Sequence, residues 1–239
     1  MADREAGVTI RVVTYNVHKC RGMDRRTRPA RVAEVLREVN PDIAALQEVM
    51  QHQVEVIASE LGLRFVMGEN RKHAGYAYGN AVLSRFPIRD SRNYDLTVQG
   101  REERGCLRAD IGWKKLSVLH VFNVHLGTSL LERRQQGRRL VTRELVNDLS
   151  LQSPRIVLGD FNEWSRGVTT RLLRSQLESV DIRSHLNRSR TYPGFLPFLH
   201  LDHIYYDQEL KLERLTLLRT RKALVASDHL PLAAEFTAD

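Results

Sequence analysis

Seven short segments carry side chains that could bind a metal ion or contact a phosphate group. In chain order they are Thr-Tyr-Asn-Val-His, Leu-Gln-Glu-Val, Gly-Asn-Ala-Val-Leu-Ser-Arg-Phe-Pro, Asn-Val-His-Leu-Gly, Gly-Asp-Phe-Asn, Leu-Asp-His-Ile-Tyr and Ser-Asp-His-Leu-Pro. Their polar residues of interest are Asn16, Glu48, Asn80, His125, Asp160, Asn162, Asp202, Asp228 and His229. Carboxylates, amides and imidazoles in this number indicate metal-assisted chemistry on a phosphate ester.

The oxygen-rich set favours a hard divalent cation. Mg²⁺ or Mn²⁺ takes oxygen ligands and keeps several waters, so a carboxylate such as Glu48 with a neighbouring amide or acid can hold it against a phosphate. Asp160 and Asn162 are two residues apart, and on extended backbone both side chains would point the same way. A histidine oriented by a carboxylate is a common proton-handling device. Cys20 and Cys106 are isolated, which disfavours a thiolate zinc site.

Each of these residues alone also has a structural explanation. Asn16 and Asn80 are typical turn or cap residues. Glu48 could sit in the first turn of a following helix, where a carboxylate is stabilised by the helix dipole. Gly-Asp-Phe-Asn could form an Asx turn, and a lone His125 could be a satisfied core histidine. The chemical interpretation therefore rests on the set and not on any one member.

The same residues lie at or just past the ends of predicted strands, where a rigid sheet can bring distant side chains together. Runs rich in β-branched residues predict strands over Val8–Tyr15, Ile43–Leu46, Ala81–Leu83, Leu116–Val124, Ile156–Leu158, His203–Tyr206 and Leu232–Phe236. Apolar spacing predicts helices over Arg28–Val39, Gln51–Leu61 and about Leu131–Leu149. Thr27 is the expected N-cap of the first helix, and Asn40 and Gly62 follow the first two helices. Alternating strands and helices indicate an α/β or α+β domain.

Composition and charge narrow the class of protein. The chain has 239 residues, 42% of them hydrophobic and 28% charged, which suits one large globular domain or two small ones. The net charge of +8 favours an anionic partner such as nucleic acid, a phospholipid headgroup or a phosphorylated small molecule. Two cysteines, no secretory segment and no membrane-length apolar run lead us to expect a cytoplasmic protein. Oligomeric state is left open.

Taken in order, the seven segments closely resemble the endonuclease/exonuclease/phosphatase superfamily, the group of deoxyribonuclease-I-like enzymes. The match spans about residues 9–236, so the resemblance implies that residues 1–239 form a single domain. The chain looks most like small bacterial members. The resemblance implies a four-layer α/β sandwich, with two mixed β-sheets face to face, helices outside, and the site at one edge of the sandwich.

The resemblance also implies roles for individual residues. Metal binding falls to Glu48, with Asn16 beside it and Asp228 near the metal. Asp160 aligns or deprotonates the attacking water, and Asn162 holds the scissile phosphate. His229 stabilises or protonates the phosphorane-like state, and Asp202 orients His229. His125 contacts the phosphate and assists the leaving group, and Asn80 and Arg104 are further candidates for phosphate contacts. His18 stands where some nucleases of the group have an acidic residue, which argues against a second metal site.

We therefore expect a Mg²⁺- or Mn²⁺-dependent hydrolase of phosphate esters, either a phosphodiesterase or a phosphatase. The main alternative is an endonuclease or exonuclease acting on DNA or RNA. A non-catalytic binding module is disfavoured because every expected catalytic position is filled.

Two further features bear on substrate. Arginines cluster at Arg21, Arg25, Arg26, Arg28 and Arg31, and again at Arg133, Arg134, Arg138, Arg139 and Arg143. They predict either a funnel for polyanions or a solvated surface. Residues 191–199, Thr-Tyr-Pro-Gly-Phe-Leu-Pro-Phe-Leu, could stack on a base, enter a lipid interface or pack under their own loop.

Overall fold

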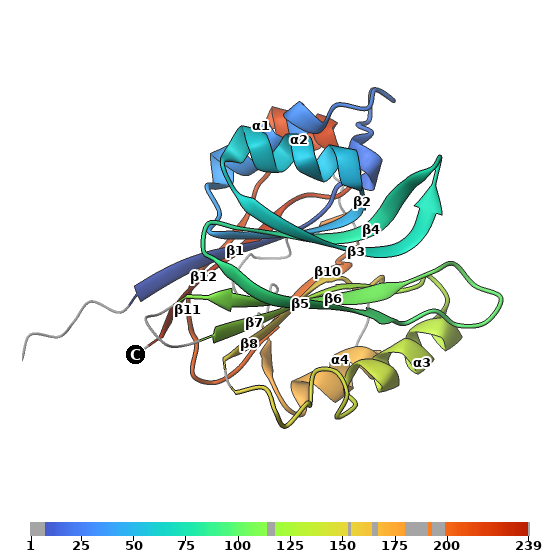
Figure 1. Ribbon diagram of the computed structural model, residues 1–239, viewed down its shortest axis with the longest axis vertical. Coiled ribbons are helices and arrows are strands. Elements are labelled where there is room, and N and C mark those ends of the chain that lie inside the picture. The colour runs from blue at the N-terminus through green and yellow to red at the C-terminus, as the bar shows by residue number, and fades with distance from the viewer. Residues whose placement is uncertain are drawn as a thin grey trace, which may run out of the picture.

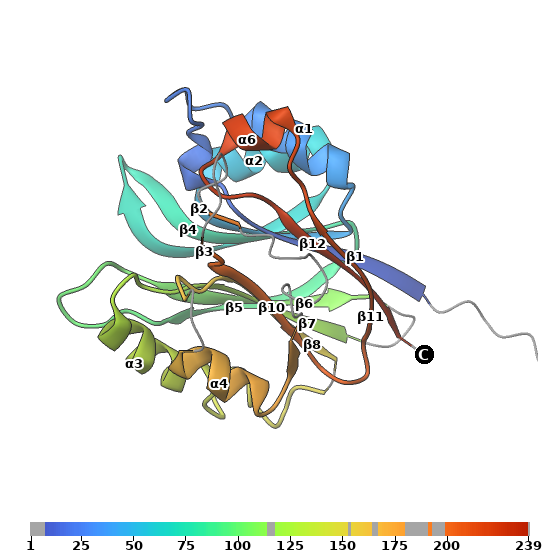
Figure 2. The same ribbon diagram turned by 180° about the vertical axis from the view of Figure 1, so that it is seen from behind.

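Two six-stranded sheets lie face to face, with helices covering their outer faces (Figures 1 and 2). The structure is a computed structural model that describes residues 8–113, 118–152, 154–163, 167–179, 191–192 and 199–238. The layers follow the order helices, sheet, sheet, helices, so the predicted four-layer α/β sandwich is confirmed.

The first sheet has the strand order β11-β12-β1-β2-β4-β3. Its strands are β1 (Val8–Asn16), β2 (Ile43–Met50), β3 (Arg64–His73), β4 (Tyr76–Ser84), β11 (Lys211–Leu217) and β12 (Leu232–Ala238). Within this sheet β1 and β2 are parallel, whereas the other neighbours pair antiparallel. The carboxyl ends of β1 and β2 therefore meet at one edge of the sheet.

The second sheet has the order β5-β6-β7-β8-β10-β9. Its strands are β5 (Ile88–Asp95), β6 (Gly105–Gly112), β7 (Val118–His125), β8 (Arg155–Asp160), β9 (Glu178–Ser179) and β10 (Asp202–Tyr206). Here β7 and β8 form the parallel pair, and the remaining neighbours are antiparallel. Each sheet is mixed, and each has one central parallel pair.

Three apolar clusters hold the layers together. Between the sheets, side chains such as Val12, Ile43 and Val121 are fully buried. A second cluster packs α1 (Pro29–Val39), α2 (Gln51–Leu61) and α6 (Arg221–Ala226) on the first sheet. A third packs α3 (Leu130–Leu140) and α4 (Val168–Arg174) on the second sheet. Burial on both faces explains why the central strands have nearly continuous apolar sequences.

Most of the predicted elements are present, and α2 has the predicted bounds. As predicted, Asn40 follows α1 and Gly62 follows α2. Both residues are in the left-handed conformation, with φ of 50° and 64°. The expected N-cap is wrong, because Arg28 and not Thr27 precedes α1, and no side chain caps that end. The strand predicted over Leu116–Val124 corresponds to β7, and its predicted start at Leu116 lies outside the described residues.

The third helix is shorter than predicted, because α3 ends at Leu140. The Thr142 hydroxyl donates to Arg139 O, and the Asn147 side-chain amide donates to Val141 O. Side chains thus take the carbonyls that a continuing helix would use. As a result Leu149, the last residue of the predicted helix, lies outside α3 and is 83% exposed.

The apolar runs did not predict strands β3, β5, β6, β9 and β11. β3 and β5 are edge strands rich in polar residues, so they lack an extended apolar pattern. β6 is central, but it buries Arg108 and Asp110. Arg108 pairs with Asp90 and Asp110, and His120 pairs with Asp110. Paired charges can be buried, yet they break the hydropathy signal of a strand.

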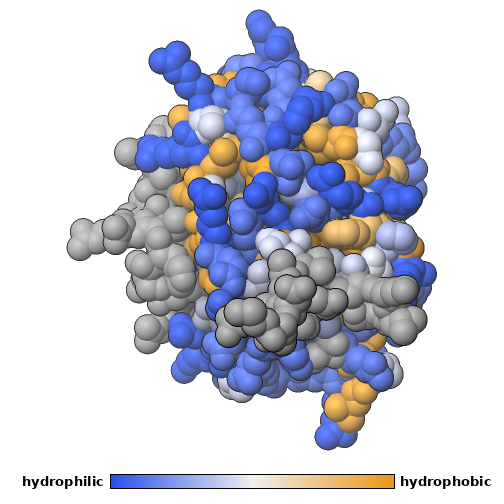
Figure 3. Space-filling model, turned by 90° about the vertical axis from the view of Figure 1, so that its left-hand side faces the viewer, coloured by the Kyte–Doolittle hydropathy of each residue, from blue (hydrophilic) through white to orange (hydrophobic). Residues whose placement is uncertain are grey.

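The surface gives no sign of a membrane-crossing element among the described residues, because none of their helices is long and apolar enough. Figure 3 shows the side of the molecule that lies on the left in Figure 1. Over the described residues it is mostly hydrophilic, and hydrophobic areas there are small and separated by polar ones.

Candidate active site

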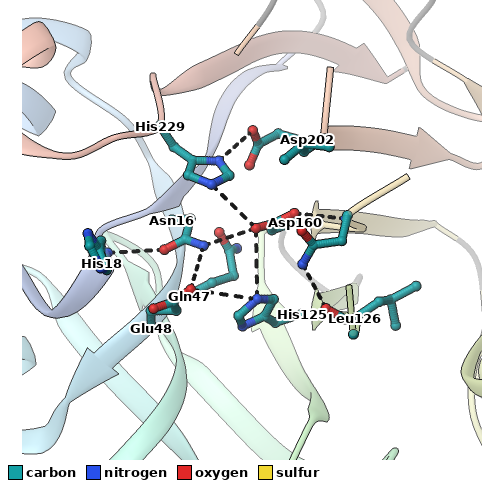
Figure 4. Close-up of polar contacts among 12 residues, drawn as sticks. Asn16, His18, Gln47, Glu48, His125, Leu126, Asp160, Asp202 and His229 are labelled. Atoms are coloured by element: carbon teal, nitrogen blue, oxygen red, sulfur yellow. Dashed lines mark hydrogen bonds and ion pairs between the residues drawn. The ribbon is translucent and has the colours of Figure 1, made fainter. Parts of the chain in front are cut away.

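The predicted site residues converge because of where their strands end. Asn16, His125 and Asp160 are the last residues of β1, β7 and β8, and Asp202 is the first residue of β10. β10 pairs antiparallel to β8 with Asp202 opposite Asp160. The two sheets thus deliver these four side chains to the same edge of the sandwich (Figure 4). The convergence expected from the sequence is present.

Glu48 reaches this edge through an irregularity in β2. The register between β2 and β4 shifts between Leu46 and Val49, and Glu48 has φ of 55°. A left-handed non-glycine residue costs about 1–3 kcal/mol, and such positions concentrate at functional sites. Glu48 belongs to β2 and not to α2, which begins at Gln51, so its alternative explanation as a first-turn helix residue is wrong.

The Glu48 carboxylate is held by neighbours on both oxygens. Asn16 Nδ2 donates to Oε1 over 3.1 Å, and the Tyr78 hydroxyl donates to Oε2 over 3.1 Å. Lys19 Nζ lies 3.9 Å from Oε2. Burial alone would raise the pKa of Glu48, but charge on His125, the Asn16 hydrogen bond and Lys19 lower it to about 2. Glu48 is therefore a fixed, ionised carboxylate.

This carboxylate fits a hard divalent cation. Its side chain is 20% exposed, so an ion can reach it from solvent. Mg²⁺ is commonly bound through one or two carboxylates with several waters, and such a site needs no cage of protein ligands. Among the described residues no group of three or more His, Cys, Asp or Glu side chains is arranged as such a cage.

Asn16 links two carboxylates and does not present its oxygen to them. Its Oδ1 accepts from the His18 backbone N–H over 3.0 Å, which fixes the orientation of the amide. Its Nδ2 donates to Glu48 Oε1 and to Asp160 Oδ2, over 3.1 and 3.0 Å. The prediction that Asn16 binds metal does not match this orientation, because a metal ion needs the oxygen. Asn16 positions Glu48 and Asp160 instead.

Asp160 and Asp202 flank the imidazole of His229. Asp202 Oδ2 lies 3.0 Å from His229 Nδ1, and Asp160 Oδ2 lies 3.6 Å from His229 Nε2. All three residues are buried. Burial alone would lower the pKa of His229, but Asp202 and Asp160 raise it to about 10, so His229 is a cation at neutral pH. Burial raises the pKa of Asp160, which makes it a better proton acceptor than an exposed aspartate.

His125 stands in a different environment. Arg104 NH1 lies 3.3 Å from His125 Nδ1, whereas Glu48 Oε1 and Asp160 Oδ2 each lie 3.8 Å from Nε2. Since a guanidinium only donates, Nδ1 accepts and the hydrogen of the neutral ring is on Nε2. Burial and Arg104 lower the pKa of His125 to about 4. His125 is therefore a neutral donor aimed at the carboxylates.

Asn162 lies beside Asp160, but the backbone between them is not extended as predicted. Its φ of 49° is left-handed, so the backbone is not extended and the same-face argument is wrong. Its backbone N–H donates to Asp160 Oδ1 over 2.9 Å, and its Nδ2 donates to Leu126 O over 2.8 Å. The Asx turn considered from the sequence is thus present, and it also brings Asn162 to the strand that ends in His125.

The geometry can be compared with known proteins. The family model described as endonuclease/exonuclease/phosphatase family matches residues 13–229. The chain belongs to this family. The protein YbhP of Escherichia coli (strain K12) is 35% identical, over 98% of this chain and 99% of YbhP.

Solved structures of the same fold include a phosphatase and a complex with DNA. A mannosyl-6-phosphatase of Bacteroides thetaiotaomicron VPI-5482 superposes with a TM-score of 0.80 at 18% identity, covering 95% of this chain and 99% of that one. TDP2 of D. rerio, complexed with a single-strand DNA product, superposes with a TM-score of 0.76 at 16% identity, covering 96% and 99%. At these identities the likeness concerns the fold alone.

Within this member of the family, Asn80 lies away from the surface of the site. It is inside β4 and not at a strand end, and it is fully buried. Its Nδ2 donates to Gly105 O and Asn123 O of the opposite sheet. The expected phosphate contact through this amide is not supported, because the amide joins the two sheets.

Two residues that the sequence argument passed over complete this inter-sheet connection. Gln47 Nε2 donates to Asn123 Oδ1 over 2.7 Å, and Asn123 Nδ2 donates to Leu46 O and Ala81 O, each over 2.8 Å. Both side chains are fully buried. They stand next to Glu48 and two positions before His125, so they fix the strands that carry those residues. Their position inside the quoted motifs was the available signal.

The remaining predicted residues have mixed outcomes. Asp228 Oδ1 lies 3.6 Å from His18 Nδ1, and both side chains are partly exposed. The ring of Tyr192 lies 4.8 Å from that of His229, whereas residues 193–198 lie outside the described part of the chain. Arg133 is buried and donates to Gly127 O and Thr128 O, so it does not belong to the cationic surface expected on α3. The helix exposes Arg134, Arg138 and Arg139 instead.

Proposed function

We propose that the protein hydrolyses phosphate esters with the aid of a bound divalent cation, Mg²⁺ or Mn²⁺, and that Asp160 accepts the proton of the attacking water. The main support is the position of Asp160 Oδ2, which accepts a hydrogen bond from Asn16 Nδ2 over 3.0 Å. The same oxygen lies 3.6 Å from His229 Nε2 and 3.8 Å from His125 Nε2. A carboxylate so placed is oriented, has a raised pKa and faces two groups that can contact the same phosphate.

Glu48 is the residue proposed to hold the cation, with Asp228 as a second acidic neighbour. When bound, a divalent cation would polarise a phosphate oxygen and offset the charge that develops on it. Asn16 donates to both Glu48 and Asp160 and so offsets part of the repulsion between these two carboxylates. His125 Nε2, 3.8 Å from each of them, also lies next to both.

The two histidines are proposed to bind the phosphate in different ways. His229 supplies positive charge to the transition state, and Asp202 keeps its ring oriented and protonated. His125 supplies a neutral N–H, which Arg104 fixes on Nε2. Asn162 is held close to Asp160 by the Asx turn. One hydrogen of its Nδ2 goes to Leu126 O, and the other is proposed to contact the phosphate.

The substrate class is proposed to be a small or lipid-borne phosphate ester, cleaved by phosphatase or phosphodiesterase action. Exposed arginines at Arg25, Arg26 and Arg28 and along α3 favour nuclease activity as the second candidate. The two solved structures described above fall on either side of this choice, since one is a mannosyl-6-phosphatase and the other is complexed with a single-strand DNA product.

Metal dependence is the direct test. Activity on bis-p-nitrophenyl phosphate, phenyl phosphate, plasmid DNA, RNA and sphingomyelin should vanish in EDTA and return with Mg²⁺ or Mn²⁺. Full activity in EDTA would refute the proposal.

Glu48→Gln tests the ligand separately from turnover. This change keeps the shape and removes the charge, so Mn²⁺ affinity measured by calorimetry or electron paramagnetic resonance should fall about tenfold or more. Glu55→Gln on the exposed face of α2 is the matched control and should bind Mn²⁺ normally. Unchanged affinity in Glu48→Gln would remove Glu48 as the ligand.

A further inference from the structure

A small cavity opens beside Arg104, on the side of His125 that faces away from the carboxylates. It has a volume of about 290 Å³ and is lined by Gly100, Arg101, Glu102, Arg104, Thr128 and Glu132. We call it the side cavity. The β5–β6 loop and the first turn of α3 form its walls, and both views place these segments next to each other (Figures 1 and 2). Since Arg104 also contacts His125, the side cavity adjoins the proposed phosphate site.

The α3 wall of the side cavity is built from buried polar contacts. Gln136 Oε1 accepts from Gly127 N over 2.8 Å, and Arg133 NH1 donates to Gly127 O and Thr128 O. The Glu132 carboxylate lies directly over Gly127, where a Cβ atom would overlap it. Glycine at position 127 therefore leaves the space that this carboxylate occupies.

Two buried charged groups line the side cavity from opposite walls. Glu132 is 6% exposed, and its Oε1 accepts from Gln136 Nε2 over 3.2 Å. Arg104 is 7% exposed and donates through NH2 to Glu102 over 2.7 Å. Its Nε is buried and has no hydrogen-bond partner among the described residues. The guanidinium nitrogen NH2 thus carries the contact that Arg104 makes to the lining of the side cavity.

The composition of the lining restricts what the cavity can bind. Arg101 and Arg104 balance Glu102 and Glu132, so a second phosphate would meet no net positive charge and would lie near buried Glu132. Among the described residues that line the cavity, none has an apolar side chain to receive an acyl chain or an aromatic ring to stack a base. Carboxylates accept hydrogen bonds and guanidinium groups donate them. Neighbouring hydroxyl groups, each both donor and acceptor, match that set.

We propose that the side cavity binds the hydroxyl groups of a sugar or polyol that is esterified to the phosphate, and thereby selects sugar or polyol phosphates as substrates. The volume lies at the low end of ligand pockets, roughly 300–1,000 Å³, and suits one ring. Glu132 and Arg101 are the specificity-determining residues. The inference rests on the proposed function, because it requires the phosphate to sit beside His125.

The test compares two phosphate monoesters. Glucose 6-phosphate carries hydroxyls on its leaving group, whereas phenyl phosphate carries none. The ratio of kcat/KM for glucose 6-phosphate to kcat/KM for phenyl phosphate should fall about tenfold in Glu132→Gln, since the sugar hydroxyl then donates to a neutral acceptor in place of a charged one. In Arg101→Gln it should fall severalfold. Arg139→Gln, on the exposed face of α3, should leave the ratio unchanged, and melting temperatures report folding.

A binding measurement separates failure of this inference from failure of the proposed function. Glucose 6-phosphate should shift the amide resonances of Gly100 and Thr128 in wild-type protein and much less in Glu132→Gln. Shifts without hydrolysis of glucose 6-phosphate or of any ester in the panel above, in Mg²⁺ or Mn²⁺, would keep the side cavity and refute the hydrolase. Hydrolysis of phenyl phosphate with no such shifts, and a ratio that Glu132→Gln leaves unchanged, would refute the side cavity alone.

Discussion

His125 and His229 differ in charge although they lie in the same site at nearly equal burial. Their Nε2 atoms lie 3.8 and 3.6 Å from the same oxygen, Asp160 Oδ2. The pKa of His125 is nevertheless lowered to about 4, whereas that of His229 is raised to about 10. Burial favours the neutral form in both cases. The residue at Nδ1 differs: Arg104 faces His125, and Asp202 faces His229.

The comparison teaches that the neighbour on the far side of the ring sets the charge of each histidine. At pH 7 a pKa near 4 leaves His125 neutral, and a pKa near 10 leaves His229 charged. One site therefore holds a neutral hydrogen-bond donor and a cation on either side of one carboxylate. The following variants test whether the two histidines differ in function as they do in charge.

Removing His229 should have the largest effect. A positioned acid or base typically contributes about 10²–10⁴-fold, so His229→Ala should lower kcat by that amount. His52→Ala changes an exposed histidine on α2 and should leave kcat unchanged. If His229→Ala had normal turnover per folded molecule and only a lower melting temperature, His229 would be a packing residue.

Asp202→Asn should cost a substantial part of the same loss, because Asn cannot supply the negative charge that raises the pKa of His229. The double variant Asp202→Asn/His229→Ala should be little worse than His229→Ala, since residues that act as one unit are not additive. Kinetics on the three variants measure this coupling. Multiplicative losses would mean that Asp202 and His229 act independently.

Glutamine substitutions should distinguish the role of His125 as a neutral donor from the role of His229 as a cation. A glutamine amide can donate a hydrogen bond but carries no charge. His125→Gln should therefore retain about tenfold more kcat than His125→Ala, because a neutral donor remains. His229→Gln should be nearly as inactive as His229→Ala. Equal rescue at both positions would contradict the assignment of charge to His229 alone.

The smallest effect is expected outside the pair of histidines. Arg25 and Arg26 are exposed in the loop before α1, so reversing both to Glu should raise KM severalfold and reduce its salt dependence, with kcat within about twofold. The matched control reverses Lys211 and Arg214, which are exposed on the edge strand β11. A large fall in kcat at saturating substrate would place the arginines in the chemistry.

Much of this arrangement could be predicted from the sequence because polar residues follow apolar, β-branched strands. That pattern located Asn16, His125 and Asp160 at strand ends, and the order of the seven segments indicated the family. The pairing of Asp202 with His229 was also predicted and is present at 3.0 Å. Local sequence is sufficient where a strand must end and a polar residue follows it.

Other features were decided by contacts between segments far apart in the chain. The orientation of the Asn16 amide depends on the His18 backbone and on Glu48 and Asp160 together. The left-handed conformation of Glu48 depends on pairing between β2 and β4, and the early end of α3 depends on Thr142 and Asn147. No local propensity encodes these outcomes.

Hydrophobic periodicity and strand ends are local properties, so the sequence by itself indicated an α/β or α+β domain and the polar groups at its strand ends. The four layers were implied by the resemblance to the family. Only the tertiary structure decided which histidine is charged, which amide atom faces a carboxylate, and that a cavity with both signs of charge adjoins Arg104. The reason is that pKa values and hydrogen-bond directions depend on distances of a few ångströms between groups that chain folding brings together.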